Sequence, residues 1–191
     1  MAKMVKRRPY DSPQRRAQAL VTRRAILDAA RHLFIERGYG ATTLQAIADK
    51  ASVSVATVYA AFVNKRTVLE QLVDVSIAGD DEPVAIADRP WVAELANEPD
   101  RGRRIRMLAA NGRRILERRS AVDAVVQAAA ASDPEIATLW EKIRRQRREG
   151  QGRLLPLVAG LEGLGAGLDP AEAADVLYAI ASPETYRLLV E

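Results

Sequence analysis

The side chains in this sequence that could carry out chemistry favour binding over catalysis. The 191 residues include no cysteine and one histidine, His32, which excludes thiolate zinc sites, cysteine nucleophiles and histidine metal clusters. The clustered carboxylates Asp80, Asp81 and Glu82 stand between Gly and Pro, where a charged loop is usually only solvated. We therefore expect no enzymatic activity, no cofactor and no metal. The lack of cysteine also fits the reducing cytoplasm, where we expect the protein to act.

Charge is distributed unevenly along the chain. Residues 1–66 contain 13 Lys and Arg against 4 Asp and Glu, a net charge of +9, whereas residues 67–191 contain 16 against 21, a net charge of −5. This pattern is typical of a polyanion-binding unit joined to a body with another task, although a basic tail that only aids solubility has the same composition. No apolar run approaches the roughly 20 residues that span a bilayer, so we expect no membrane partner.

Helices must position the small side chains of ASVSVATVYAAF, residues 51–62. Apolar residues recur at helical spacing over residues 26–34, and Gly38 is expected to end that first helix. Thr43 is placed to cap a second helix, and Ser54 is placed to cap a third. Two short helices joined by so tight a turn form a helix-turn-helix, whose second helix can enter a major groove.

The rest of the chain also has helical periodicity, and no segment alternates with period two for the length of a strand. A fourth helix is expected to start near Lys65, and further helical segments are expected at 91–96, 101–118, 121–131, 133–158, 170–181 and 183–191. The sequence thus predicts an all-α fold. We divide it into a basic flexible arm (1–19), a three-helix helix-turn-helix DNA-binding domain (20–66) and a helical domain (67–191).

The third helix begins with Val55, Ala56 and Thr57, which cannot make the bidentate base contacts of Arg, Asn or Gln. Their methyl groups can instead pack on thymine C5-methyl groups, and the Thr57 hydroxyl can reach a base edge or a phosphate. Hydrogen-bonded readout is then expected from the second helix and from a basic arm in the adjacent minor groove, through Gln45, Arg7, Arg8, Arg15 or Arg16.

The segments LF.ERGY..TT, IA..A.VS..T.Y..F and K...L follow one another in residues 26–72, which resemble the DNA-binding domain of the TetR family of bacterial transcriptional regulators. The resemblance implies phosphate or base contacts by Thr43, Ser54, Thr57, Tyr59 and Lys65. Thr43 and Ser54 are explained equally well as helix caps, and Tyr59 could belong to the core. The family often has glycine where Ser52 stands; a serine in that left-handed turn costs about 1–2 kcal/mol.

The segments SDPEIATLW and GLDPAEAADVLYAIASPETYRLLV resemble the C-terminal ligand-binding and dimerisation half of some TetR-family members. This resemblance implies a homodimer and a small-molecule effector held between helices. Dimer contacts are expected from Leu154, Val158, Leu177, Tyr178 and Leu188. Apolar stripes that could line the effector site include Trp91, Met107, Leu108, Asn111, Ile115, Val125, Ala129, Trp140 and Ile143, although packed core explains each of them as well.

The arginine-rich runs RGRRIRM, NGRRILERR and EKIRRQRREG are expected to be solvated helix faces, with Glu117, Glu141 and Glu149 as partners. The function expected is a sequence-specific DNA-binding transcriptional regulator, a repressor that a small-molecule effector releases from a palindromic double-stranded DNA operator. Two alternatives are a ligand-binding helical protein without a transcriptional role and a non-specific DNA-binding protein.

Overall fold

The chain folds into helices throughout the part that the computed structural model describes, residues 13–80, 82, 84–160, 163 and 169–190. The helices are α1 (Pro13–Ala41), α2 (Leu44–Lys50), α3 (Val55–Phe62), α4 (Lys65–Ala78), η1 (Ile86–Asp88), α5 (Pro90–Asn97), α6 (Arg101–Ala130), α7 (Pro134–Ala159), α8 (Pro170–Ile180) and α9 (Pro183–Val190). These residues contain no β-strand, which confirms the predicted all-α fold. None of these helices is both long enough and apolar enough to cross a bilayer.

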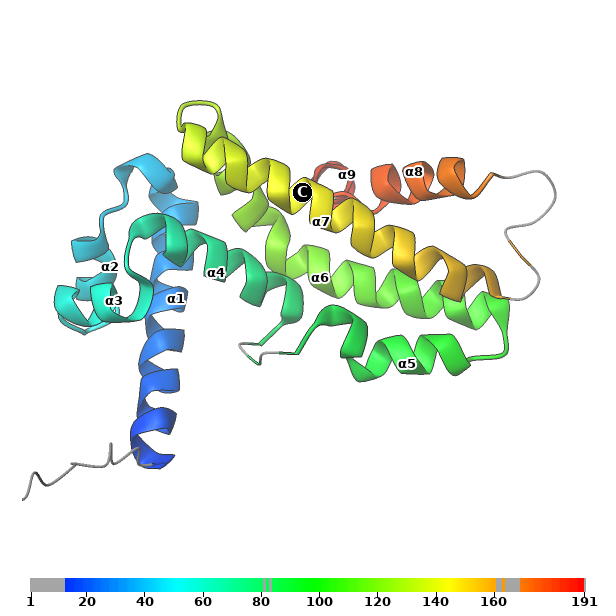
Figure 1. The fold of residues 1–191 in the computed structure, drawn as a ribbon. Helices are drawn as coiled ribbons and strands as arrows, with labels where there is room; N and C mark the ends of the chain where they lie inside the picture. The colour runs from blue at the N-terminus through cyan, green and yellow to red at the C-terminus, as the bar shows by residue number, and fades with distance from the viewer. Residues whose placement is uncertain (1–12, 81, 83, 161–162, 164–168, 191) are drawn as a thin grey trace, which may run out of the picture.

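Helices α1 to α3 form a head at one end of the molecule, and α5 to α9 form most of an elongated body (Figure 1). Helix α4 runs from the head into the body and contacts both α1 and α6. The two longest helices of the body, α6 and α7, pack along each other, and α5 and α8 lie toward the end farther from the head.

The turn between α2 and α3 follows from its local hydrogen bonds. The Ser52 N–H donates to the Asp49 carbonyl (3.1 Å), and the Val53 N–H donates to the Ala48 carbonyl (3.0 Å), the pairing of a Schellman motif. That motif requires a left-handed residue, and Ser52 has φ 55°. The predicted left-handed turn is confirmed, with serine in the position that glycine occupies at lower cost.

The first helix ends where the sequence predicts and begins earlier than predicted. Gly38 interrupts α1 with φ 77° and ψ 166°, so the regular helix ends at the predicted glycine and a short turn follows it. At the other end α1 already begins at Pro13, and residues 13–19 are therefore helical rather than part of a flexible arm. The predicted DNA contacts Arg7 and Arg8 lie outside the described residues.

Helix α6 is continuous where the sequence predicts two segments, 101–118 and 121–131. The polar pair Arg119 and Ser120 separates those segments in the sequence, but both residues are buried inside one helix. Arg119 donates to Asp123 one turn later, through Nε to Oδ2 (2.8 Å) and Nη2 to Oδ1 (3.1 Å). This internal ion pair explains how a buried charged residue is accommodated without a break in the helix.

The hydrophobic core joins the head to the near half of the body. It runs from α1 to α4 through Val122 and Val126 of α6 to Ile136 and Ile143 of α7. The buried residues of α6 all lie between Arg119 and Val126, whereas none in the fully described stretch 101–118 is buried. The two halves of α6 therefore stand in different surroundings.

Candidate nucleic-acid interface

An open hollow of about 630 Å³ lies where α2, α3 and the start of α4 meet. It is lined by Gly40, Thr42, Thr43, Leu44, Gln45, Val55, Tyr59, Asn64 and Lys65. Five of these, Thr43, Gln45, Val55, Tyr59 and Lys65, are predicted DNA contacts. The fold thus brings together on one face residues that are up to 22 positions apart in the sequence.

Helix α3 presents its small side chains as the sequence predicts. Ala56 and Tyr59 are exposed, whereas Val58 and Phe62 are buried and hold the helix to the core. Val55 is only half-exposed, because part of its side chain packs against the core. A helix anchored by one face and lined with methyl groups on the other can approach a groove closely.

Ser54 and Thr57 form the cap at the start of α3. The Ser54 Oγ accepts from the Thr57 N–H (3.1 Å) and lies 2.8 Å from the Thr57 Oγ1. Thr43 has the same role in α2, where its Oγ1 accepts from the Ala46 N–H (3.1 Å). The capping interpretation of Thr43 and Ser54 is confirmed, and their contact with DNA stays a prediction.

Tyr59 does not belong to the core. Its side chain lies on the surface, with 54% of the residue exposed. An exposed phenol about one turn from the start of α3 can donate its O–H to a phosphate oxygen. This exposure favours the interface role over the core alternative.

Lys65 has partners inside the protein. Its Nζ donates to the carbonyl oxygens of Tyr39 (2.8 Å) and Thr42 (2.9 Å) and lies 4.2 Å from the centre of the Tyr39 ring. Burial lowers the pKa of this ammonium group, and the charge of Asp133 opposes that shift. A cation is unfavourable at the N-terminus of a helix, and the sequence predicts a phosphate as the partner of Lys65. In the structure the carbonyls of Tyr39 and Thr42 stabilise this cation.

Gln45 is exposed on α2, and its Nε2 donates to the Asp49 Oδ1 (2.7 Å). This contact leaves the amide oxygen and the second N–H of Gln45 for a base edge. Base readout by Gln45 stays a prediction.

Three residues of this region have roles that the sequence analysis did not assign. Asn64 caps α4 by accepting from the Thr67 N–H (2.8 Å), and Thr42 is buried and donates to the Gly38 carbonyl (2.8 Å). Arg23 of α1 donates to the Ala61 carbonyl (3.2 Å) and to Gln71 (2.7 Å), and its guanidinium lies 4.4 Å from the centre of the Phe62 ring. Asparagine before a helical run was a readable cap signal; Arg23 and Thr42 act through long-range contacts that have no local pattern.

The residues predicted to hold an effector are on α5, α6 and α7. Val125 and Ile143 are buried in the hydrophobic core, and Trp140 packs against it. Ala129 also packs against it. The other five are half-buried, and they are Trp91, Met107, Leu108, Asn111 and Ile115. Asn111 donates its side-chain amide to the Met107 carbonyl one turn earlier (3.0 Å). A ligand contact by any of these nine stays a prediction.

Most arginines of the basic runs lie on solvated faces, as predicted. Arg113 pairs with Glu117 (2.8 Å) and Arg144 with Glu141 (3.2 Å), and these side chains are largely exposed. Glu149, the third expected partner, lies 4.0 Å from Arg153, which follows the runs.

Several arginines of these runs do not fit the solvated-face interpretation. Arg104 is half-buried and donates to the Val158 carbonyl (3.2 Å) and the Glu98 carbonyl (3.0 Å). Arg119 is buried.

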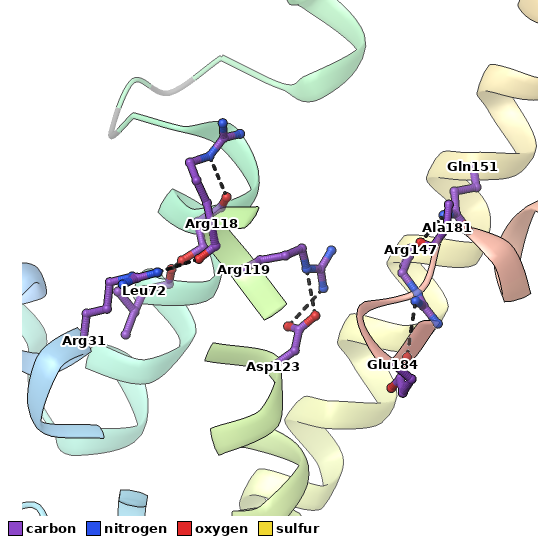
Figure 2. Close-up of polar contacts among 10 residues, drawn as sticks. Arg31, Leu72, Arg118, Arg119, Asp123, Arg147, Gln151, Ala181 and Glu184 are labelled. Atoms are coloured by element: carbon purple, nitrogen blue, oxygen red, sulfur yellow. Dashed lines mark hydrogen bonds and ion pairs between the residues drawn. The ribbon is translucent and has the colours of Figure 1, made fainter. Parts of the chain in front are cut away.

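Arg147 is a further exception to the solvated-face interpretation. Its side chain is only 11% exposed and lies 3.8 Å from Glu184 of α9, with its guanidinium 4.0 Å from the centre of the Tyr178 ring. Figure 2 shows Arg147 and Gln151 of α7 directed toward the α8–α9 connection.

The hollow, the caps and the anchored helix α3 define a class of protein, an all-helical protein with a helix-turn-helix DNA-binding head. Residues 26–72 match the sequence profile described as "Bacterial regulatory proteins, tetR family". The "Uncharacterized HTH-type transcriptional regulator YvkB" of Bacillus subtilis (strain 168) is 49% identical over 51 residues. That match spans 27% of this chain and 27% of the relative, about a quarter of its length.

Solved structures extend the similarity to the body. A putative TetR-family regulator from Syntrophomonas wolfei is similar with a TM-score of 0.65 and 19% identity, over 89% of this chain and 84% of that one. A regulator of the TetR/AcrR family from Thermobifida fusca is similar with a TM-score of 0.57 and 27% identity, over 86% and 84% of the two chains. The head of the chain, residues 26–72, matches the TetR family of bacterial regulatory proteins, and the described fold as a whole is similar to those of solved regulators of that family.

Proposed function

We propose that this chain is a transcriptional repressor that binds a palindromic DNA operator as a homodimer and leaves it when a small molecule binds the body. The observation that carries the proposal is the convergence of Thr43, Gln45, Val55, Tyr59 and Lys65 on one open face of the head. Small side chains at the start of α3 favour close approach and thymine contacts over polar base readout.

Exposed apolar side chains at the end of the chain support the homodimer. Val176 and Ile180 of α8 are 52% and 65% exposed, and Leu188 and Leu189 of α9 are 87% and 79% exposed. An apolar surface of this kind marks an interaction site in a soluble protein. A twofold interface there, to which Leu154, Val158, Leu177 and Tyr178 would also contribute, sets two heads at a fixed separation.

The effector is proposed to act through α4, which connects the head to the body. Ligand bound between α5, α6 and α7 would shift α4 and change the separation of the two heads. To turn a mostly competent population into a mostly incompetent one, the ligand must favour the second state by about 5.5 kcal/mol. A protein that works in this way meets DNA and effector in the cytoplasm.

The operator is identified by selecting bound duplexes from a random DNA pool, followed by competition with unselected duplex. We expect a palindrome that unselected DNA displaces poorly. Tyr59→Phe should weaken binding to that palindrome by about fivefold, close to the 1 kcal/mol of one hydrogen bond. Tyr186→Phe, on α9, is the matched control and should bind as the wild type does. Equal competition by unselected duplex would favour a non-specific DNA-binding protein, and no binding at all would favour a ligand-binding protein without a transcriptional role.

A further inference from the structure

Arg118 of α6 is hydrogen-bonded to α1, which belongs to the head, and to α4, which connects the head to the body. Its Nε donates to the Ser76 carbonyl and its Nη2 donates to the Ile77 carbonyl, each at 3.1 Å, in the last turn of α4. Its own carbonyl accepts from the Arg31 Nη2 of α1 at 2.9 Å. Figure 2 shows Arg31 and Arg118 meeting beside α4, so one residue of the body is hydrogen-bonded to α1 and to α4.

The C-terminal end of α4 is a favourable binding site for this guanidinium. The last carbonyls of a helix have no partner within the helix, and its C-terminus carries partial negative charge, so a cation there is favourable. Helix α4 ends at Gly79 with φ 90°, and a Cβ atom at this position would stand 3.1 Å from the Arg118 Cζ. Any other residue at position 79 would therefore be strained and would crowd the guanidinium.

Arg118 also lies at the boundary between the two halves of α6. Residues 101–118 are half-buried or exposed, and the buried part of the helix starts at Arg119. Met107, Asn111, Ile115 and Arg118 follow one another at intervals of four, four and three residues, which places them on one face of the helix. The stripe proposed for the effector thus continues directly into the residue that holds α4.

Besides the shared hydrophobic core, two ion pairs on the surface link α4 to α7. Arg66 lies 3.5 Å from Glu135, and Glu70 lies 2.5 Å from Lys142. Exposed ion pairs of this kind contribute little to stability. Arg118 is half-buried, and its guanidinium makes two charge-assisted hydrogen bonds to α4 that are less exposed to solvent than those ion pairs.

We propose that Arg118 is a positioning residue for DNA binding: it fixes the C-terminal end of α4, and with it the head, relative to α6. A ligand on the α6 stripe would act on the operator by moving this guanidinium away from the Ser76 and Ile77 carbonyls. The inference rests on the proposed function for its DNA readout. Its structural readout, the order of the last turn of α4, needs no DNA.

The test compares the wild type with Arg118→Gln and with Arg113→Gln, a matched control on the exposed face of the same helix. Amide hydrogen exchange is followed in residues 76–79, and affinity is measured for the selected operator duplex. For Arg118→Gln we expect exchange in the last turn of α4 to rise about tenfold and operator affinity to fall about fivefold, the effect of one or two lost charge-assisted hydrogen bonds. Arg113→Gln should leave both quantities at wild-type values.

Two results would overturn the proposal. Unchanged exchange in Arg118→Gln would show that the guanidinium does not hold α4, and faster exchange with unchanged operator affinity would show that it has only a structural role. If Arg118→Gln does not fold, Arg118→Lys keeps the charge but not the two-carbonyl geometry and should show both effects to a smaller extent. Failure of the wild type to bind any operator would refute the proposed function, while the exchange result still decides whether Arg118 holds α4.

Discussion

The two halves of the body differ in what surrounds them. Near the head, α6 and α7 contribute buried residues to a core that is continuous with α1 to α4. Farther from the head, residues 101–118 of α6 contain no buried side chain, and α7 has none between Ile143 and Ala159, a stretch that the structure describes in full. The first half is packed against the head, and the second leaves side chains of α6 and α7 half-exposed or exposed. The proposed effector stripe therefore lies in the part of α6 that contributes no buried residue.

The largest expected difference between the two regions is in packing energy. Phe62, which is 1% exposed, holds α3 to the core, and Phe62→Ala should lower the free energy of unfolding by about 3–5 kcal/mol. Ile105 in the far half of α6 is 49% exposed, and Ile105→Ala should cost less than about 1 kcal/mol. Urea unfolding followed by circular dichroism measures both. Similar losses for the two variants would remove the distinction between the two halves.

The buried ion pair of α6 marks the start of the packed half. The side chains of Arg119 and Asp123 are 6% and 2% exposed, so Asp123→Ala leaves a buried guanidinium without its partner and should cost about 3 kcal/mol. Replacing both, with Arg119→Met and Asp123→Leu, should restore most of that loss because no charge remains buried. The same unfolding measurement applies. If the double variant is as unstable as Asp123→Ala, the ion pair contributes net stability to the fold beyond offsetting the cost of burying its own two charges.

The same pair predicts a pH dependence. Burial raises the pKa of the Asp123 carboxyl, and Arg119 only partly opposes this. A carboxyl with a raised pKa in the folded state contributes stability that is complete below its unfolded pKa and is lost as the pH rises through the folded value. Asp123→Asn should therefore flatten the fall in stability on going from about pH 4 toward neutral, measured as unfolding free energy against pH. A steeper fall in the variant would mean that Arg119 dominates the ionisation of Asp123.

The smallest effect is expected at the turn of the head. Ser52→Gly removes the Cβ from a residue with φ 55°, and the relief of strain is partly offset by the flexibility of glycine in the unfolded chain. The net stabilisation should be about 1 kcal/mol or less. The control is Gly150→Ala in the interior of α7, which removes a glycine instead of introducing one. It should raise the free energy of unfolding by a similar amount. A destabilised Ser52→Gly would mean that the serine side chain supports the turn.

The head could be read from the sequence because its signals are local. The caps Thr43 and Ser54, the stop at Gly38 and the left-handed turn at Ser52 each depend on neighbours within a few residues, and the structure has all four. The body offered fewer such signals. Arg147 looked like one of several solvated arginines, and only the packing of α7 against α8 and α9 turns its side chain inward.

The sequence predicted which residues lie at the candidate interface better than it predicted the partners of their side chains. Periodicity and capping located Val55, Tyr59 and Lys65 near one face, but the internal partners of Lys65 come from a turn 23 residues or more away. The role of Arg118 could not be predicted for the same reason, because its contacts depend on where the end of α4 lies relative to α6. Contacts between distant segments require the fold, whereas caps and turns do not.

The proposed function requires two identical heads to bind one DNA duplex. Hydroxyl-radical footprinting of the selected operator tests this directly, because it maps every protected sugar on both strands. We expect two protected patches on one face of the duplex, related by a dyad, with centres one helical turn of about 10–10.5 base pairs or a whole multiple of it apart. A single patch, or uniform protection without a dyad, would contradict the account.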